Sequence, residues 1–342
     1  KFQEVIMPFL KDSSQEIAET AAVALGLLGN PASIEVLKHL LEDTSEGRAH
    51  VSSEGGVNYR TRAFATFGLG QIGYFTQDPG HRLDIVHALW KVCESPRMST
   101  RDIKVAAVIS MGLVPLDIEV VTDPADGEEE ASGAPRNRHE QVQYLIEFFT
   151  DDKDPNKHHL VRAHAPRAIA KLLEGTDDIT LKDQAVAAFK PFVSKRGHIG
   201  EREVRQSASR AFGMLGDLDD DKSDKDIRAA LIDASANADQ QVKNYSVIAL
   251  GQVGGRPGTG DDPLVGQEAV RKYLLTTLAR GKTQVKPWAG LALGVMERGM
   301  LEANLEQNDS VLEALQASLK DTRTKQEVGA YALALGIAGN NE

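Results

Sequence analysis

The residues best suited to chemistry form an acidic run, Asp217-Leu218-Asp219-Asp220-Asp221-Lys222-Ser223. A calcium-binding loop needs oxygen-bearing side chains at alternating positions, and this run supplies them. A helix–loop–helix calcium site also needs glycine at its sixth position and glutamate at its twelfth. Lys222 and Arg228 occupy those positions. We therefore interpret the run as a solvated turn and not as a metal site.

Other chemical motifs are equally incomplete. His158, His159 and His164 lie close together, but the His-Glu-x-x-His spacing of zinc enzymes is absent and no cysteine or carboxylate pattern converges on them. There is no nucleophile elbow and no Walker-type phosphate loop. The sole cysteine, Cys93, lies on an amphipathic segment and is expected to be a buried structural thiol. The sequence predicts no catalytic residue, no metal and no cofactor.

The elements around these residues repeat one helical signature. Val204, Ala208, Ala211, Phe212 and Leu215 follow the 3.6-residue spacing of an amphipathic helix, which ends in Gly-x-x-Gly. The same signature recurs along the chain. Its anchor positions are Gly26, Gly70, Gly112, Ala170, Gly213, Gly251, Gly294 and Gly336, with successive spacings of 44, 42, 58, 43, 38, 43 and 42 residues. Six of these seven spacings fall near the roughly 40–47-residue period of helical repeat arrays.

A second column of residues keeps the same register. A basic residue stands eight positions before the anchor in six of the eight copies: Arg62, Lys104, Arg162, Arg205, Lys243 and Lys286. Another amphipathic segment precedes each signature helix, and four of these segments end in aspartate: Asp12, Asp43, Asp151 with Asp152, and Asp321. Each unit is therefore predicted to be a helix, a turn and a second helix.

This arrangement resembles HEAT repeats over nearly the whole chain. The resemblance implies an all-α fold, a right-handed α-solenoid of about eight HEAT-like helical pairs, in which an acidic turn residue meets the basic residue of the second helix. We place the repeats at about 1–30, 32–73, 81–115, 139–175, 179–216, 224–254, 267–299 and 310–340 of a single solenoid spanning 1–342. HEAT-type iron hydroxylases carry several His-Glu pairs, whereas this chain has His139-Glu140 alone.

Two departures from the repeat are visible. The long period leaves an insert at 116–138, which is rich in acidic residues and is predicted to be a loop. In the fourth repeat, Pro166 should interrupt the second helix. The last signature helix is apolar on nearly every side, so we expect end-to-end self-association or flanking repeats to cover it.

Composition narrows the partners. The formal net charge is −11, which argues against nucleic-acid binding. No apolar run is long enough to span a membrane. The chain begins at Lys1, so a leader could have been removed. We expect a soluble protein, with a cytoplasmic location favoured and the compartment left open.

In HEAT arrays the second helices usually line the concave side, so the resemblance implies a groove there. Around the anchors, amides, arginines and aromatics recur on these helices. The predicted partner-binding residues are Arg167, Gln206, Arg210, Gln241, Asn244, Tyr245, Gln284 and Trp288. Tyr245 and Trp288 have polar tips that favour an interface, whereas Phe64 in the same column is expected in the core.

Such a groove suits an extended peptide or a helix of another protein. The leading hypothesis is therefore a non-catalytic scaffold that binds a protein or peptide of unknown identity. The alternative is a HEAT-like enzyme or accessory subunit of the phycobilin lyase type, whose similar short helical repeats nothing in this sequence separates from a scaffold. A HEAT-like nucleic-acid glycosylase is disfavoured because it would need a strongly basic groove.

Overall fold

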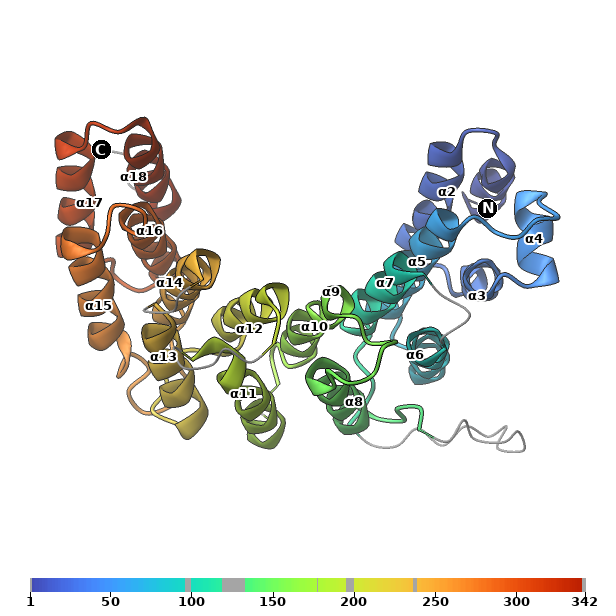
Figure 1. Cartoon of the computed structure of the whole chain (residues 1–342), viewed down its shortest axis with the longest axis horizontal. Coiled ribbons are helices and arrows are strands. Elements are labelled where there is room, and N and C mark those ends of the chain that lie inside the picture. Colours follow the sequence, from blue (N-terminus) through green and yellow to red (C-terminus); the bar gives the residue numbers. More distant parts are fainter. Residues whose placement is uncertain are drawn as a thin grey trace. The chain divides into compact units, whose positions relative to one another are not determined.

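We describe the protein from a computed structural model, which covers residues 2–95, 100–118, 133–176, 178–194, 200–235 and 239–339. The described residues form helices, turns and connecting segments and contain no strand. The chain divides into two compact units, Lys1–Leu172 (unit 1) and Leu173–Glu342 (unit 2). Each unit is described by itself (Figure 1).

Unit 1 contains pairs of helices that pack through apolar faces. Its elements are α1 (Phe2–Ile6), η1 (Met7–Lys11), α2 (Gln15–Leu27), η2 (Pro31–Ser33), α3 (Ile34–Glu42), α4 (Ser45–Val51), α5 (Tyr59–Phe75), α6 (Pro79–Glu94), α7 (Arg101–Met111), α8 (Arg138–Thr150), α9 (His159–Arg162) and α10 (Ala165–Leu172). The pairs are α3 with α5, α6 with α7, and α8 with α10. Helix α4 is an addition that sequence periodicity did not predict.

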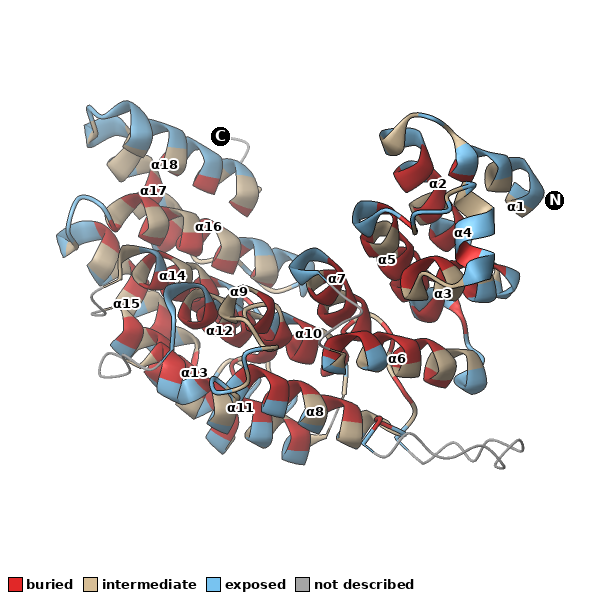
Figure 2. Cartoon of the chain, turned by 45° about the vertical axis from the view of Figure 1, so that its right-hand side comes forward, coloured by how far each residue is buried: buried red, intermediate tan, exposed pale blue. Residues whose placement is uncertain are grey.

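Unit 2 is more regular. It contains α11 (Ile179–Val193), α12 (Arg202–Leu215), α13 (Lys222–Ala234), α14 (Gln240–Gly254), α15 (Gln267–Arg280), α16 (Lys286–Glu302), α17 (Asp309–Asp321) and α18 (Lys325–Ala338). Consecutive helices pair, and the second helices α12, α14, α16 and α18 pack side by side. In the interior helices the buried residues occupy the faces between neighbours (Figure 2).

The anchor glycines explain why second helices approach so closely. A Cβ atom added to Gly251 would lie under 3.0 Å from the backbone of Ala292 on the next second helix. Glycine and alanine at such crossings leave room for the two backbones. The repeated signature is therefore a packing requirement, and it accounts for the low aromatic content of 5%.

The basic column has a structural role that differs from the expected acid–base pair alone. Arg62 Nε donates to the carbonyl oxygen of Leu41 at 2.8 Å, and Arg162 Nε donates to that of Phe149 at 2.8 Å. Both carbonyls belong to the last turn of the preceding first helix, where helical carbonyls have no partner within the helix. These arginines thus cap one helix from the next.

Two sequence expectations concern interrupted regions. The second helix of the fourth repeat is divided into α9 and α10, and Pro166 is the second residue of α10, where its missing N–H costs little. Of the acidic insert, residues 119–132 lie outside the described residues. The repeat boundaries and the insert remain predictions.

Candidate functional site

The second-helix surface of unit 2 brings together several of the predicted binding residues. Arg210 on α12 is exposed, and its guanidinium carbon lies 5.5 Å from the centroid of the half-buried Tyr245 ring on α14. A cation held over an aromatic face gains electrostatic stabilisation. The pair presents a positive charge and the Tyr245 ring on adjacent helices.

Asn244 and Trp288 form a second link, between α14 and α16. An indole N–H can only donate, so the oxygen of the facing Asn244 amide must point toward it. In that orientation the oxygen accepts from Trp288 Nε1 at 3.2 Å, and the amide nitrogen donates to the carbonyl of Gln240 at 3.2 Å. Asn244 is 5% exposed and Trp288 is half-buried. The indole therefore contributes its partly exposed ring, because its polar tip is engaged within the protein.

The predicted glutamines are less unified. Gln206 Nε2 lies 3.5 Å from Asp239 Oδ1, at the limit of a hydrogen bond. Asp239 caps α14 by accepting from the backbone N–H groups of Gln241 and Val242, at 2.9 and 3.0 Å. Gln241 and Gln284 are exposed. These amides border the surface that Arg210, Tyr245 and Trp288 form.

Arg167 belongs to unit 1, on α10, and is exposed. It therefore remains a separate predicted contact, and the other seven predicted residues belong to unit 2.

Unit 1 has an aromatic cleft that sequence analysis missed. The cleft measures about 490 Å³ and lies between α5 and α7; its lining residues are Tyr59, Arg60, Ala63, Phe64, Phe67, Asp102 and Val105. The rings of Phe64 and Phe67 meet edge to face, with centroids 6.5 Å apart. Phe64, expected in the core, is half-buried and contributes to this cleft. Only the packing of α7 beside α5 creates the recess, so column alignment could not reveal it.

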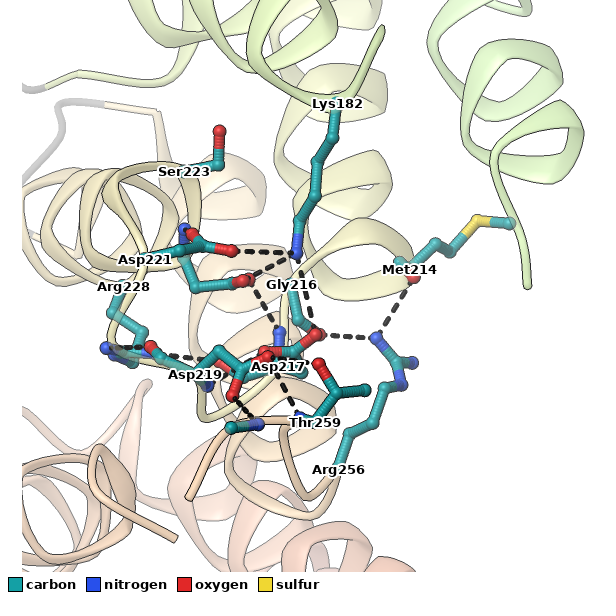
Figure 3. A network of polar contacts seen from close by, with 12 residues as sticks. Lys182, Met214, Gly216, Asp217, Asp219, Asp221, Ser223, Arg228, Arg256 and Thr259 are labelled. Atoms are coloured by element: carbon teal, nitrogen blue, oxygen red, sulfur yellow. Dashed lines mark hydrogen bonds and ion pairs between the residues drawn. The ribbon is translucent and has the colours of Figure 1, made fainter. Parts of the chain in front are cut away.

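The acidic run after α12 is a structural junction. Carboxylate oxygens of Asp217, Asp219 and Asp224 lie within 4.8 Å of one another, as a cation site would require. Lys182 of α11 points into this group (Figure 3), with Nζ 2.5 Å from Asp224 Oδ2 and 3.5 Å from Asp217 Oδ2. Its ammonium group supplies the positive charge that balances the carboxylates.

The remaining contacts hold two loops together. Asp219 accepts from Thr259 N at 2.9 Å, Thr259 Oγ1 at 3.0 Å and Gly260 N at 2.9 Å. Arg228 donates to the carbonyls of Asp217 and Asp219, both at 2.8 Å. Arg256 donates to Met214 O at 3.0 Å and also to Gly216 O. The arginines and loop amides thus join the segment after α12 to the segment after α14.

Burial raises the pKa of Asp224 to about 7, against the opposing effect of the Lys182 ammonium group. Asp219 differs: burial opposes ionisation, but the hydrogen bonds from Thr259 and Gly260 lower its pKa. These opposite shifts reflect a desolvated carboxylate next to one that receives backbone hydrogen bonds.

Cys93 and the histidines do not form a reactive centre among the described residues. The Cys93 thiol is buried, and burial raises its pKa to about 12, which suppresses the thiolate. His158 and His159 stack with ring centroids 4.2 Å apart, and His158 Nδ1 accepts from the backbone N–H of Leu160 at 3.2 Å. These groups are used in packing and helix capping.

Comparisons with known proteins agree with the repeat architecture. A sequence model of the PBS lyase HEAT-like repeat matches residues 17–43. None of the curated proteins compared with the chain matches it. Among the described helices, none combines the length and apolar character needed to cross a bilayer.

Among solved structures, the chain is similar to a protein of the Kap95:Nup1 complex, with a TM-score of 0.50, 11% identity, and coverage of 98% of this chain and 40% of that one. YibA of Escherichia coli gives a TM-score of 0.45 and 15% identity over 99% of this chain and 92% of that one. An engineered protein gives 0.43 and 17% over 99% and 78%. The predicted fold class, a right-handed α-solenoid of HEAT-like pairs, is confirmed, as is its identification as a HEAT-repeat protein.

Proposed function

We propose that this HEAT-repeat protein is a non-catalytic scaffold that binds an extended segment of another protein through the second helices of unit 2. The observation that carries the proposal is the surface on which Arg210, Tyr245 and Trp288 meet across three successive second helices. Arginine, tyrosine and tryptophan are the residues most enriched among those that dominate binding energy at protein interfaces.

The chemistry of this surface favours a particular kind of partner. Arg210 is exposed and offers a guanidinium group to a carboxylate, while the rings of Tyr245 and Trp288 offer partly apolar faces. Gln241 and Gln284 add amide donors and acceptors suited to a peptide backbone. We therefore expect a segment with an acidic residue beside an apolar one.

The aromatic cleft of unit 1 supports the same class of function. Phe64, Phe67 and Val105 form an apolar recess, and the exposed carboxylate of Asp102 lies at its border. Arg60 is committed to Glu19, which its guanidinium contacts at 2.8 Å. This cleft suits an apolar side chain that is followed by a basic one.

The experiment is a capture assay with charge-reversal variants. Arg210→Glu should lose partners that the unmodified chain retains from a lysate of the source cells. Lys272→Glu is the matched control, because Lys272 is exposed on the first helix α15 of the same unit. If both variants capture the same proteins in the same amounts, the assignment of this surface is wrong.

A second candidate is favoured by the family match at residues 17–43, whose repeat takes its description from a phycobilisome lyase. A lyase-type enzyme would bind a bilin. Incubation of the purified chain with a bilin tests this, since binding would shift the absorbance band of the chromophore. An unchanged spectrum removes this alternative and leaves the scaffold unaffected.

A further inference from the structure

The second helices follow a seating rule. At six anchors a Cβ atom would lie under 3.0 Å from one particular residue of the next second helix, always two positions before the next anchor. The six pairs are Gly26 with Gly68, Gly70 with Ser110, Gly112 with Ala168, Gly213 with Ala249, Gly251 with Ala292 and Gly294 with Ala334. Each seat therefore accepts a small residue at a fixed register.

A second contact fixes the same register. The glycine three positions after an anchor lies against the residue two positions after the next anchor, and an added Cβ would meet that side chain closer than 3.0 Å. This holds for Gly73 with Val114, Gly216 with Val253 and Gly254 with Met296. All three receiving side chains are fully buried. A glycine seat and an apolar residue four positions beyond the small one thus define the interface between successive second helices.

Helix α18 presents this seat unfilled. No atom of the described residues outside the α18 backbone lies within 4 Å of a Cβ placed on Gly336. Val328 and Leu333, on the same helix, are 40% and 57% exposed. Figure 2 shows α18 largely exposed, in contrast with α12, α14 and α16. Gly339 supplies the glycine three positions after the anchor.

Helix α2 presents the matching insert. Ala24 stands two positions before the anchor Gly26, and Leu28 stands two positions after it. Leu28 is 40% exposed, whereas Val114, Val253 and Met296 in the same column are fully buried. Ile17 and Leu27, also on α2, are 43% and 59% exposed. The chain therefore carries both halves of one interface, the seat on α18 and the insert on α2.

We infer that a second copy of this chain docks head to tail, with its α2 on the α18 face of the first. Ala24 of one copy lies against Gly336 of the other, and Leu28 packs near Gly339, so the contact continues the register of the six internal seats. Because the two surfaces differ, the contact is heterologous and leaves one free seat and one free insert at the ends. Assembly is therefore open-ended and grows with protein concentration.

Sedimentation over a concentration series tests the inference. The unmodified chain should shift to larger species as its concentration rises. Gly336→Leu should remain monomeric at concentrations where the unmodified chain associates, because leucine fills the seat. This change meets open space within the described chain and improves helix propensity, so the melting temperature should not fall. Ala279→Leu, which adds a leucine at an exposed position of α15, is the control and should associate like the unmodified chain.

A complementation experiment separates this geometry from a symmetric dimer. Leu28→Asp blocks the insert, while Gly336→Leu blocks the seat. Each variant should be monomeric alone, and circular dichroism should show that both are folded. Their mixture should form a one-to-one dimer and no larger species, since one intact seat and one intact insert remain.

Three results would overturn the inference. The unmodified chain could stay monomeric at every concentration, which is also the result expected if another protein or further repeats cover α18. Gly336→Leu could associate as the unmodified chain does. Finally, the mixed variants could fail to form a dimer, which would place any self-association elsewhere.

Discussion

Asp43 in unit 1 and Asp224 in unit 2 both follow turns between helices, yet their surroundings differ. Asp43 ends α3 with a φ of 59° and lies near the surface, where Arg48 binds both carboxylate oxygens at 2.9 Å. The Asp224 side chain is fully buried and faces Lys182 from the neighbouring first helix at 2.5 Å. The first pair is local in sequence, whereas the second links α11 to α13.

The difference shows how tertiary packing changes the meaning of an ion pair. Arg48 is 44% exposed, so water screens its attraction to Asp43. Around Asp224, the segments after α12 and α14 are joined through Asp219 and Thr259, and water is excluded from the carboxylate. A buried ion that loses its partner is much more costly than an exposed one.

The largest expected effect comes from removing the buried cation. Lys182→Met should lower the free energy of unfolding by about 3–5 kcal/mol, because Asp224 would be left buried without a counter-charge. Urea denaturation measures it. Lys190→Met on the same helix is the control: it removes a partly exposed pair with Asp226 and should cost about 0–1 kcal/mol. Equal losses in the two variants would show that Asp224 is not effectively buried.

The anchor glycines should matter equally in both units. Gly26→Ala in unit 1 and Gly251→Ala in unit 2 each place a Cβ against the backbone of the next helix. Overpacking of this kind costs about 1–3 kcal/mol, measurable by urea denaturation. Gly336→Ala should instead stabilise by about 0.5–1 kcal/mol, since its space is open and alanine favours helices. A neutral Gly251→Ala would contradict the seating rule.

The exposed turn should be more tolerant. Asp43→Ala should cost about 1–2 kcal/mol, since it removes the acceptor for the Val57 N–H, at 2.7 Å, as well as the Arg48 contact. Asp43→Asn should cost less, because asparagine accepts the Val57 hydrogen bond and tolerates positive φ. Thermal unfolding of both variants provides the ranking. The reverse order would mean that the charge contributes more than the turn.

The two carboxylates should also give opposite, smaller pH effects. The Arg48 hydrogen bond lowers the pKa of Asp43, so this stabilisation is present above the unfolded pKa of about 4 and is lost as the pH falls through the folded value. Burial raises the pKa of Asp224 to about 7, so the folded state binds the extra proton between about pH 4 and 7. The contribution of Asp224 therefore declines as the pH rises across that range.

Melting temperatures across this pH range check both signs. Asp224→Asn should flatten the decline between pH 4 and 7, and Asp43→Asn should remove stabilisation that is lost in acid. If Asp224→Asn leaves the profile unchanged, Lys182 keeps Asp224 ionised throughout.

Much of the fold could be predicted from residues alone. The spacing of the anchor glycines predicted the helical repeat, because close helix crossings need small side chains at a fixed period. The breakdown of the second helix near Pro166 was also predictable, since proline lacks the N–H that a helix interior requires. Helix α4 was missed because Ser45–Val51 carries little apolar periodicity, and Thr44 begins it by accepting from Gly47 N.

The candidate surface was predictable only in part. Helix register placed Arg210, Tyr245 and Trp288 on second helices, but the hydrogen bond that engages the Trp288 indole depends on Asn244 of a neighbouring repeat. The Phe64–Phe67 cleft likewise exists only because α7 packs beside α5. The sequence by itself determined the repeating helices, since their period and small residues are local properties. The tertiary structure decided which carboxylates lost water, which aromatic rings stayed accessible and which glycine seat stayed open, because each depends on what the neighbouring helices cover.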